Sequence, residues 1–295
     1  MDMPTAFIRH RVRDYEKWRR VAVAAACAVI FGLAGCGAAG DATSMSSPST
    51  SNLAQPSATP SSGMVEIGGG RKVYAECAGS GSPTVVLESG DESDHDQWGL
   101  VVPRLAERTR TCLYDRLGNG ASDESTGCRR MRDLRGDLEV LLRALGEDGP
   151  YVLVGTSGGG FLMAGFAYAH PDEVKGMVFV ETPHAIIPKE APPELLAELK
   201  CDSPTNRERR DYVTVENEAW SNRHLIGDIP LTVITNDYGD VYENEEQRTN
   251  VEGQKGWFKL SPRARQVVVT SGHDVPENEP DLVVNEVLQV LDAAR

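Results

Sequence analysis

Short apolar runs alternate with longer amphipathic stretches from residue 64 to the C-terminus. The apolar runs are unbroken valine and leucine stretches, as expected for strands of a sheet that is covered on both faces. Strands that alternate with helices predict an α/β fold with a mostly parallel central sheet. The predicted strands are 84–88, 110–114, 151–154, 174–180, 231–235 and 266–270, and the predicted helices are 97–108, 131–145, 158–169, 246–258 and 280–293.

Two regions depart from this alternation. Residues 65–67 and 72–76 flank three consecutive glycines, which predicts a β-hairpin at the start of the domain. Residues 183–229 lack strand signals and contain two helix-like pieces, which predicts a small helical lid. Residues 64–295 are therefore expected to form one domain around a single large core.

The N-terminal part has the layout of an export signal followed by a tether. An uncharged apolar run at 21–35 follows two arginines and is shorter than a usual membrane span. Leu33–Cys36 resembles a bacterial lipobox, in which the signal peptide 1–35 is removed and the Cys36 thiol is acylated. We therefore expect an exported protein anchored to the bacterial membrane surface by a lipid. Residues 36–63, rich in Ser, Thr, Ala, Pro and Gly, predict a flexible tether.

The overall charge is strongly acidic. The chain has a net charge of −14, and residues 1–35 carry six basic and three acidic side chains, so the exported part is three units more negative. Such a surface argues against a nucleic-acid partner and points to no specific ligand.

Four of the six cysteines, Cys77, Cys112, Cys128 and Cys201, follow the predicted signal and lipobox. In an oxidising exterior they allow three pairings, between which the sequence does not choose. Because Cys112 lies inside the apolar run 111–114, we expect it to be a small buried residue outside any disulfide.

The strongest chemical signal is Ser157 in the segment Gly155–Gly159, between a predicted strand and a predicted helix. Glycines on both sides allow strand and helix to approach closely, so that the serine hydroxyl stands clear at a sharp corner. This is the pattern of a nucleophile elbow in an acyl-transfer enzyme. The amide of Gly158, at the start of the helix, is a candidate donor to a developing oxyanion.

Several motifs in order resemble the α/β-hydrolase superfamily, from about Val65 to the C-terminus. The resemblance implies an α/β-hydrolase fold with a serine nucleophile. The motifs are Leu87–Gly90 with Trp98 downstream, Tyr114–Ser122, the elbow at Ser157, His170–Pro171 and Ser271–His273.

Serine needs a base to remove its proton, and in this superfamily the base comes last in the chain. His273, after the last predicted strand, fits that place. The acid that orients it stays open between Glu181, Asp237 and Asp240. We favour Glu181, because a carboxylate that ends a buried strand is costly without a partner.

The oxyanion needs a second donor, and the resemblance indicates the backbone amide of Asp91 in the loop after the first parallel strand. This loop departs from the His-Gly pattern of many relatives. Acidic side chains that face an oxyanion are unfavourable, so we expect those of Asp91 and Glu92 to point to solvent.

Together these residues predict a hydrolase that cleaves an ester through an acyl-enzyme on Ser157. The lid has no sustained apolar face, which favours small or medium esters. Two alternatives are a non-catalytic protein that binds a small ligand and a cofactor-free activity like that of a haloperoxidase. No residue cluster has metal-ligand spacing, and the sequence contains no phosphate-binding glycine loop followed by lysine, so no cofactor is expected.

Overall fold

The computed structural model describes residues 61–184, 193–237 and 250–295. These residues fall within one compact unit. The predicted signal peptide and Cys36 lie outside the described residues. The predicted tether needs a correction at its end, because strand β1 begins at Ser61. An edge strand pairs through its backbone, so polar side chains do not prevent residues 61–63 from joining the sheet.

Eight strands form one sheet in the order β1-β2-β4-β3-β5-β6-β7-β8. β2 is antiparallel to β1 and β4, and all the other neighbouring strands are parallel. The predicted hairpin and parallel sheet are therefore confirmed. The strands are β1 (Ser61–Glu66), β2 (Lys72–Ala78), β3 (Thr84–Glu88), β4 (Thr111–Tyr114), β5 (Tyr151–Thr156), β6 (Val174–Val180), β7 (Pro230–Asn236) and β8 (Arg263–Val269).

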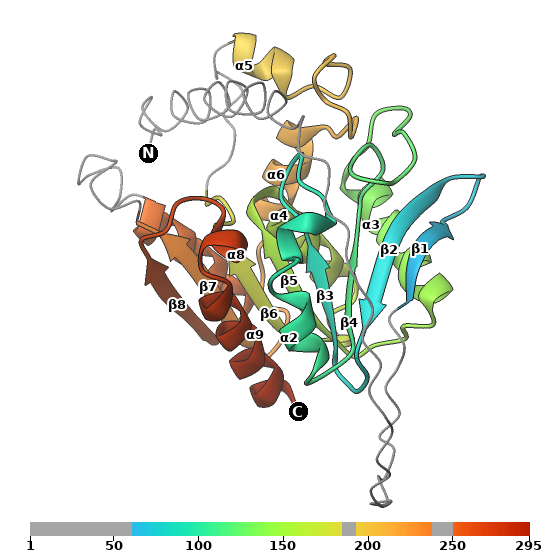
Figure 1. Cartoon of the computed structure of the whole chain (residues 1–295). Coiled ribbons are helices and arrows are strands. Elements are labelled where there is room, and N and C mark those ends of the chain that lie inside the picture. Colours follow the sequence, from blue (N-terminus) through green and yellow to red (C-terminus); the bar gives the residue numbers. More distant parts are fainter. Residues whose placement is uncertain (1–60, 185–192, 238–249) are drawn as a thin grey trace, which may run out of the picture. The chain divides into compact units, whose positions relative to one another are not determined.

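Helices cover both faces of the sheet (Figure 1). The helices α3 (Met131–Leu145), α4 (Ser157–Ala169) and α6 (Tyr212–Ser221) pack on one face, and α2 (Val102–Ala106) and α9 (Pro280–Ala294) pack on the other. Each face has its own apolar cluster, with Phe161 and Trp257 in one and Trp98 and Leu105 in the other. The shorter helices are η2 (His95–Trp98), α5 (Pro193–Glu198), η4 (Lys255–Leu260) and α8 (Val275–Asn278).

The predicted helix at 97–108 is split into η2 and α2. Gly99 lies in the interruption, and Pro103 lies in the first turn of α2, where a missing amide hydrogen costs nothing. Apolar spacing continued through the break, so the periodic pattern did not reveal it.

The segment predicted as a lid is divided between two roles. Its second half is part of the body, because α6 packs on α3 and α4 and buries Val215 and Ala219 in the core. Its first half includes α5 and the loop up to Asp211. That loop is joined to the body by a backbone bridge, in which the Arg129 amide donates to the Arg209 carbonyl.

Two disulfides join the four remaining cysteines. Cys77 on β2 is bonded to Cys112 on β4, and Cys128 is bonded to Cys201 in the first half of the lid region. The prediction that Cys112 stands outside any disulfide is therefore wrong. Burial and disulfide bonding are compatible here, since Cys77 and Cys112 are register partners on adjacent strands.

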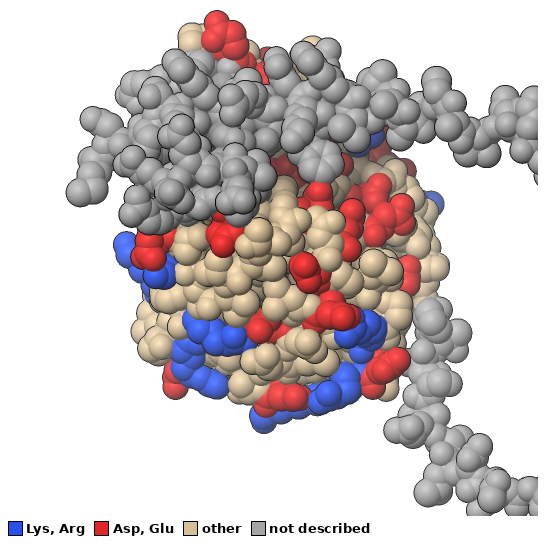
Figure 2. Space-filling model, turned by 60° about the vertical axis from the view of Figure 1, so that its left-hand side comes forward, with Lys and Arg blue, Asp and Glu red and all other residues tan. Residues whose placement is uncertain are grey.

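Charges of both signs are interspersed on the surface, as Figure 2 shows for one face. Ion pairs connect α9 to neighbouring elements, among them Arg108–Asp292 at 3.1 Å and Arg104–Asp281. Among the described residues, no helix has the length and apolar character needed to span a bilayer.

Candidate active site

Ser157 stands at the sharp corner between β5 and α4, with a φ of +44°. Residues other than glycine rarely adopt such a backbone conformation, and it persists only where the surroundings enforce it. The neighbouring glycines make the corner possible. A Cβ on Gly155 would lie 2.7 Å from the Cα of Gly160, and a Cβ on Gly159 would overlap the carbonyl oxygen of Ser89. The local sequence therefore places the serine as the elbow pattern predicts.

Glu181 directly follows β6 and is 4% exposed, with a φ of +51°. Its Oε1 accepts hydrogen bonds from the backbone amide of Asn236, at 2.6 Å, and from Nε2 of Gln254, at 3.1 Å. Its Oε2 lies 3.6 Å from Nδ1 of His273. One carboxylate oxygen is thus fixed by the protein interior, while the other faces the imidazole.

The other two candidate acids have different surroundings. Asp237 accepts a hydrogen bond from Oγ1 of Thr270 at 2.6 Å, and Asp240 lies outside the described residues. At the end of β7 stands Asn236, whose side-chain oxygen accepts from the Ser271 amide at 3.2 Å. Asn236 therefore supports both Glu181 and the histidine loop, a role that the sequence analysis missed.

Sheet topology brings the loops that carry these residues to one edge. β5, β6, β7 and β8 are parallel neighbours, so their carboxyl ends lie together. The loop after β8 contains His273 and leads into α8, which packs against η2. Such an edge is where ligands bind in open α/β sheets.

The predicted oxyanion loop runs beside the serine, because a Cβ on Gly90 would lie 3.4 Å from the Ser157 Cβ. Gln97 fixes the loop to the elbow: its Oε1 accepts from the Gly90 amide at 3.1 Å and from Oγ1 of Thr156 at 2.8 Å. Trp98 Nε1 donates to Ser89 Oγ at 3.0 Å. Buried hydrogen bonds thus hold the loop in one position.

The Asp91 side chain does not point to solvent, so that prediction is wrong. Glu92 is exposed, as expected, but the Asp91 carboxylate turns inward and pairs with Nη1 of Arg210 at 2.5 Å. It also lies directly against Gly158, on which a Cβ would overlap it. Arg210 has a fully buried side chain and compensates the inward charge. Because this cation comes from a distant segment, the sequence did not reveal it.

A buried charge network supports the loop from beneath. Arg116 pairs with Glu88 and with Glu208, and it donates to the carbonyl oxygens of Ser89 and Gly90 at 2.7 Å each. Burial raises the pKa of Glu88 despite the opposing effect of Arg116. Burial alone would also raise the pKa of Glu208, but the charge and hydrogen bonds of Arg116 outweigh it and lower that pKa to about 2.

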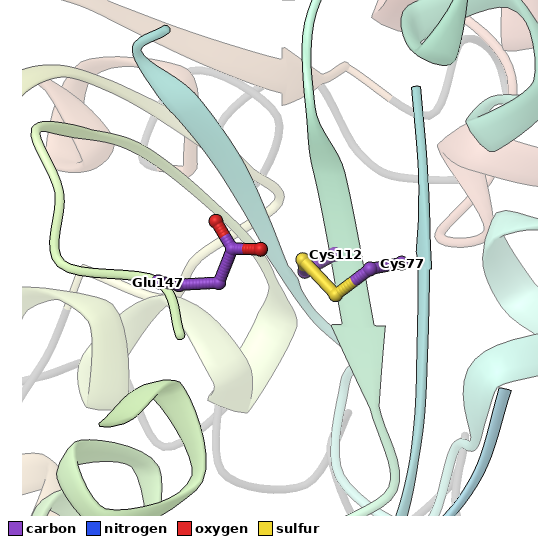
Figure 3. A group of neighbouring side chains, drawn as sticks. All are labelled: Cys77, Cys112 and Glu147. Carbon is purple, nitrogen blue, oxygen red and sulfur yellow. A yellow bond between two sulfur atoms is a disulfide. The ribbon is translucent and has the colours of Figure 1, made fainter. Parts of the chain in front are cut away.

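Cys77, Cys112 and Glu147 form a cluster of potential metal ligands (Figure 3). The two sulfurs are bonded to each other, and Glu147 pairs with Arg110 at 2.8 Å. Their ligand atoms are thus already engaged, and the cluster does not fit a metal site in this oxidised form.

Comparison with known proteins agrees with the observed fold. Residues 83–199 match the family described as alpha/beta hydrolase fold. Two solved structures with the same architecture are an epoxide hydrolase, CorEH, and an esterase from Thermogutta terrifontis. CorEH has a TM-score of 0.61 and 18% identity, over 80% of this chain and 100% of that one. The esterase has a TM-score of 0.59 and 19% identity, over 79% and 99%. The chain therefore has the α/β-hydrolase fold.

Similarity to individual curated proteins is partial. The 2-hydroxymuconate semialdehyde hydrolase of Pseudomonas sp. (strain CF600) is 30% identical over 128 residues, which are 42% of this chain and 45% of that protein. The matched segments cover 26%, 42% and 18% of the length of three further relatives, so the chain spans less than half of each.

Proposed function

We propose that the protein is a serine hydrolase that cleaves an ester through an acyl-enzyme on Ser157. The observation that carries the proposal is the strained Ser157 elbow together with the approach of Glu181 Oε2 to Nδ1 of His273 at 3.6 Å. The α/β-hydrolase fold, with an esterase among its structural neighbours, supports the same class of reaction.

In the proposed reaction the Ser157 hydroxyl attacks the ester carbonyl while Nε2 of His273 takes its proton. The amides of Gly158 and Asp91 stabilise the oxyanion that forms. The imidazolium then gives its proton to the leaving alcohol, and a water molecule hydrolyses the acyl-enzyme by the same steps in reverse order. Glu181 holds the Nδ1 hydrogen, which fixes the tautomer and stabilises the charged imidazole.

Small or medium esters are the proposed substrates. The first half of the predicted lid, residues 183–211, contains prolines and charges of both signs in place of a continuous apolar surface. Long acyl chains need such a surface to leave water, because each buried methylene contributes about 0.8 kcal/mol.

Covalent labelling with a fluorophosphonate tests the nucleophile. We expect the purified protein to be labelled, and Ser157→Ala to lose labelling while it keeps its melting temperature. Ser122→Ala is the matched control and should label normally. A folded wild-type protein that neither labels nor hydrolyses any p-nitrophenyl ester would instead favour a ligand-binding protein without turnover.

A series of p-nitrophenyl esters of increasing acyl length then tests the substrate class. We expect kcat/KM to be highest for short and medium acyl chains. A rise toward long chains would contradict the proposed substrate class and leave the nucleophile assignment intact. Peroxide-dependent halogenation by the same sample would identify the haloperoxidase-like alternative.

We also propose that the protein is exported and carries a lipid on Cys36. Two disulfides support an oxidising compartment, where such bonds persist. Expression in bacteria with radiolabelled palmitate should label the membrane-bound wild-type protein. Cys36→Ser should lose both the label and the membrane fraction, and unchanged fractionation of this variant would contradict the anchor.

A further inference from the structure

The Asp91 carboxylate occupies an unusual place for a negative charge. It lies against the first turn of α4, where a Cβ on Gly158 would overlap Oδ1. With bond lengths of about 1.5 Å, Oδ1 is within about 5 Å of the Gly158 nitrogen, one of the two proposed oxyanion donors. The oxyanion forms about 3 Å from that nitrogen, so an uncompensated carboxylate would lie ~5–8 Å from it and would slow the reaction by about 10²-fold at an effective dielectric constant of ~20.

Arg210 is placed to cancel that charge. Its Nη1 lies 2.5 Å from Asp91 Oδ1, and its Nη2 donates to the carbonyl oxygen of Gly158 at 3.1 Å. The guanidinium therefore contacts Asp91 and Gly158, the two residues whose backbone amides are the proposed oxyanion donors. The side chain of Arg210 is 0% exposed and that of Asp91 is 24% exposed, so water screens the interaction only in part.

No other described cation pairs with Asp91. Arg116 is already shared between Glu88 and Glu208, so it has two carboxylates to balance. Loss of Arg210 would leave the loop with an excess of negative charge next to the serine.

We propose that Arg210 is a positioning residue that neutralises Asp91 and thereby keeps the oxyanion site electropositive. The inference rests on the proposed function and adds a residue to it from the lid region. The segment that delivers Arg210 is tied to the body by the Cys128–Cys201 disulfide and by the backbone bridge at Arg129. Docking of this segment against the body therefore places Arg210 beside Asp91 and Gly158.

Charge-compensating substitutions separate this role from a merely structural one. Arg210→Gln should lower kcat by about 10²-fold with little change in KM, because the oxyanion forms in the transition state and not in the bound ester. Adding Asp91→Asn should restore kcat to within about tenfold of wild type, since the amide removes the charge and keeps the backbone donor. Arg207→Gln, which removes an exposed arginine from the same segment, is the matched control and should leave kcat unchanged.

Each outcome decides the inference. If Arg210→Gln retains wild-type kcat, or if the double variant is as slow as Arg210→Gln while folded, the neutralising role is wrong. If Arg210→Gln alone does not fold, the charge-free pair Asp91→Asn with Arg210→Met replaces it, and a folded but inactive pair overturns the proposal. Fluorophosphonate labelling of the wild-type protein is measured in parallel: its absence would defeat the proposed function itself, whereas its presence confines any failure to Arg210.

Discussion

At the scale of single residues, the acid is the member of the proposed triad that the sequence identifies least well. Glu181 and Asp237 each directly follow one of two neighbouring parallel strands, β6 and β7, so chain position does not separate them. Their contacts do: the Glu181 carboxylate is buried and approaches His273, whereas Asp237 accepts from Thr270.

Replacing these two acids by their amides tests the difference. Glu181→Gln should lower kcat by roughly 10³–10⁴-fold, because the amide favours the wrong imidazole tautomer and cannot stabilise its charged form. Asp237→Asn should change kcat by less than about threefold. Steady-state kinetics on a p-nitrophenyl ester, with circular dichroism to confirm folding, would check both, and the opposite ranking would move the acid to the end of β7.

Gly160 illustrates how closely the elbow packs. A Cβ there would overlap the buried side chain of Thr182, next to Glu181. Gly160→Ala should therefore destabilise the protein by about 1–3 kcal/mol. Gly136→Ala on α3 meets nothing within 4 Å and should stabilise by ~0.5–1 kcal/mol. Urea unfolding of both variants would measure the contrast, and equal effects would mean that α4 shifts freely.

At the scale of elements, the two disulfides differ in the parts of the chain that they connect. Cys77–Cys112 joins adjacent strands that already pair through the sheet, whereas Cys128–Cys201 joins the lid region to the loop before α3. The latter encloses the longer loop, with a sequence separation of 73 against 35.

Serine pairs in place of each disulfide separate stability from activity. Both pairs should lower the free energy of unfolding by about 2–4 kcal/mol, because each bond restricts the unfolded chain. Cys128→Ser with Cys201→Ser should also reduce kcat, since the segment with Glu208 and Arg210 loses its covalent link. Cys77→Ser with Cys112→Ser should keep kcat near wild type. Equal kcat in both pairs would show that noncovalent contacts alone dock the segment.

At the scale of the whole molecule, the buried charges under the site make stability depend on pH. Because the folded-state pKa of Glu208 is lowered to about 2, from an ordinary value of 4.5, its contribution is full above pH 4.5 and lost as the pH falls toward 2. The raised pKa of Glu88 acts in the opposite sense, since its protonation favours the folded state as the pH falls.

Urea unfolding between pH 7 and pH 2 tests the balance. The wild-type free energy of unfolding should fall below pH 4.5, by up to about 3 kcal/mol from Glu208 alone. Glu208→Gln should be less stable at pH 7 and should show a flatter dependence in this window. Parallel curves for the two proteins would mean that Arg116 and Glu208 do not stabilise the folded state as an ion pair.

The sequence by itself determined the strand and helix pattern, the hairpin and the serine corner. Each of these depends on apolar periodicity or on glycines within a few residues, and such local effects can be seen in the chain alone. The break between η2 and α2 was not predicted, because the apolar residues keep a helical spacing across Gly99 and Pro103.

Only the tertiary structure decided the disulfide pairing, the inward turn of Asp91 and the approach of Glu181 to His273. Each depends on a contact between distant segments, as between Asp91 and Arg210, which are 119 residues apart. A carboxylate turns to the interior where a cation pairs with it and otherwise faces solvent, because burial of an unpaired charge costs too much free energy. That cation reaches Asp91 through the docking of residues 199–211, which local patterns do not specify.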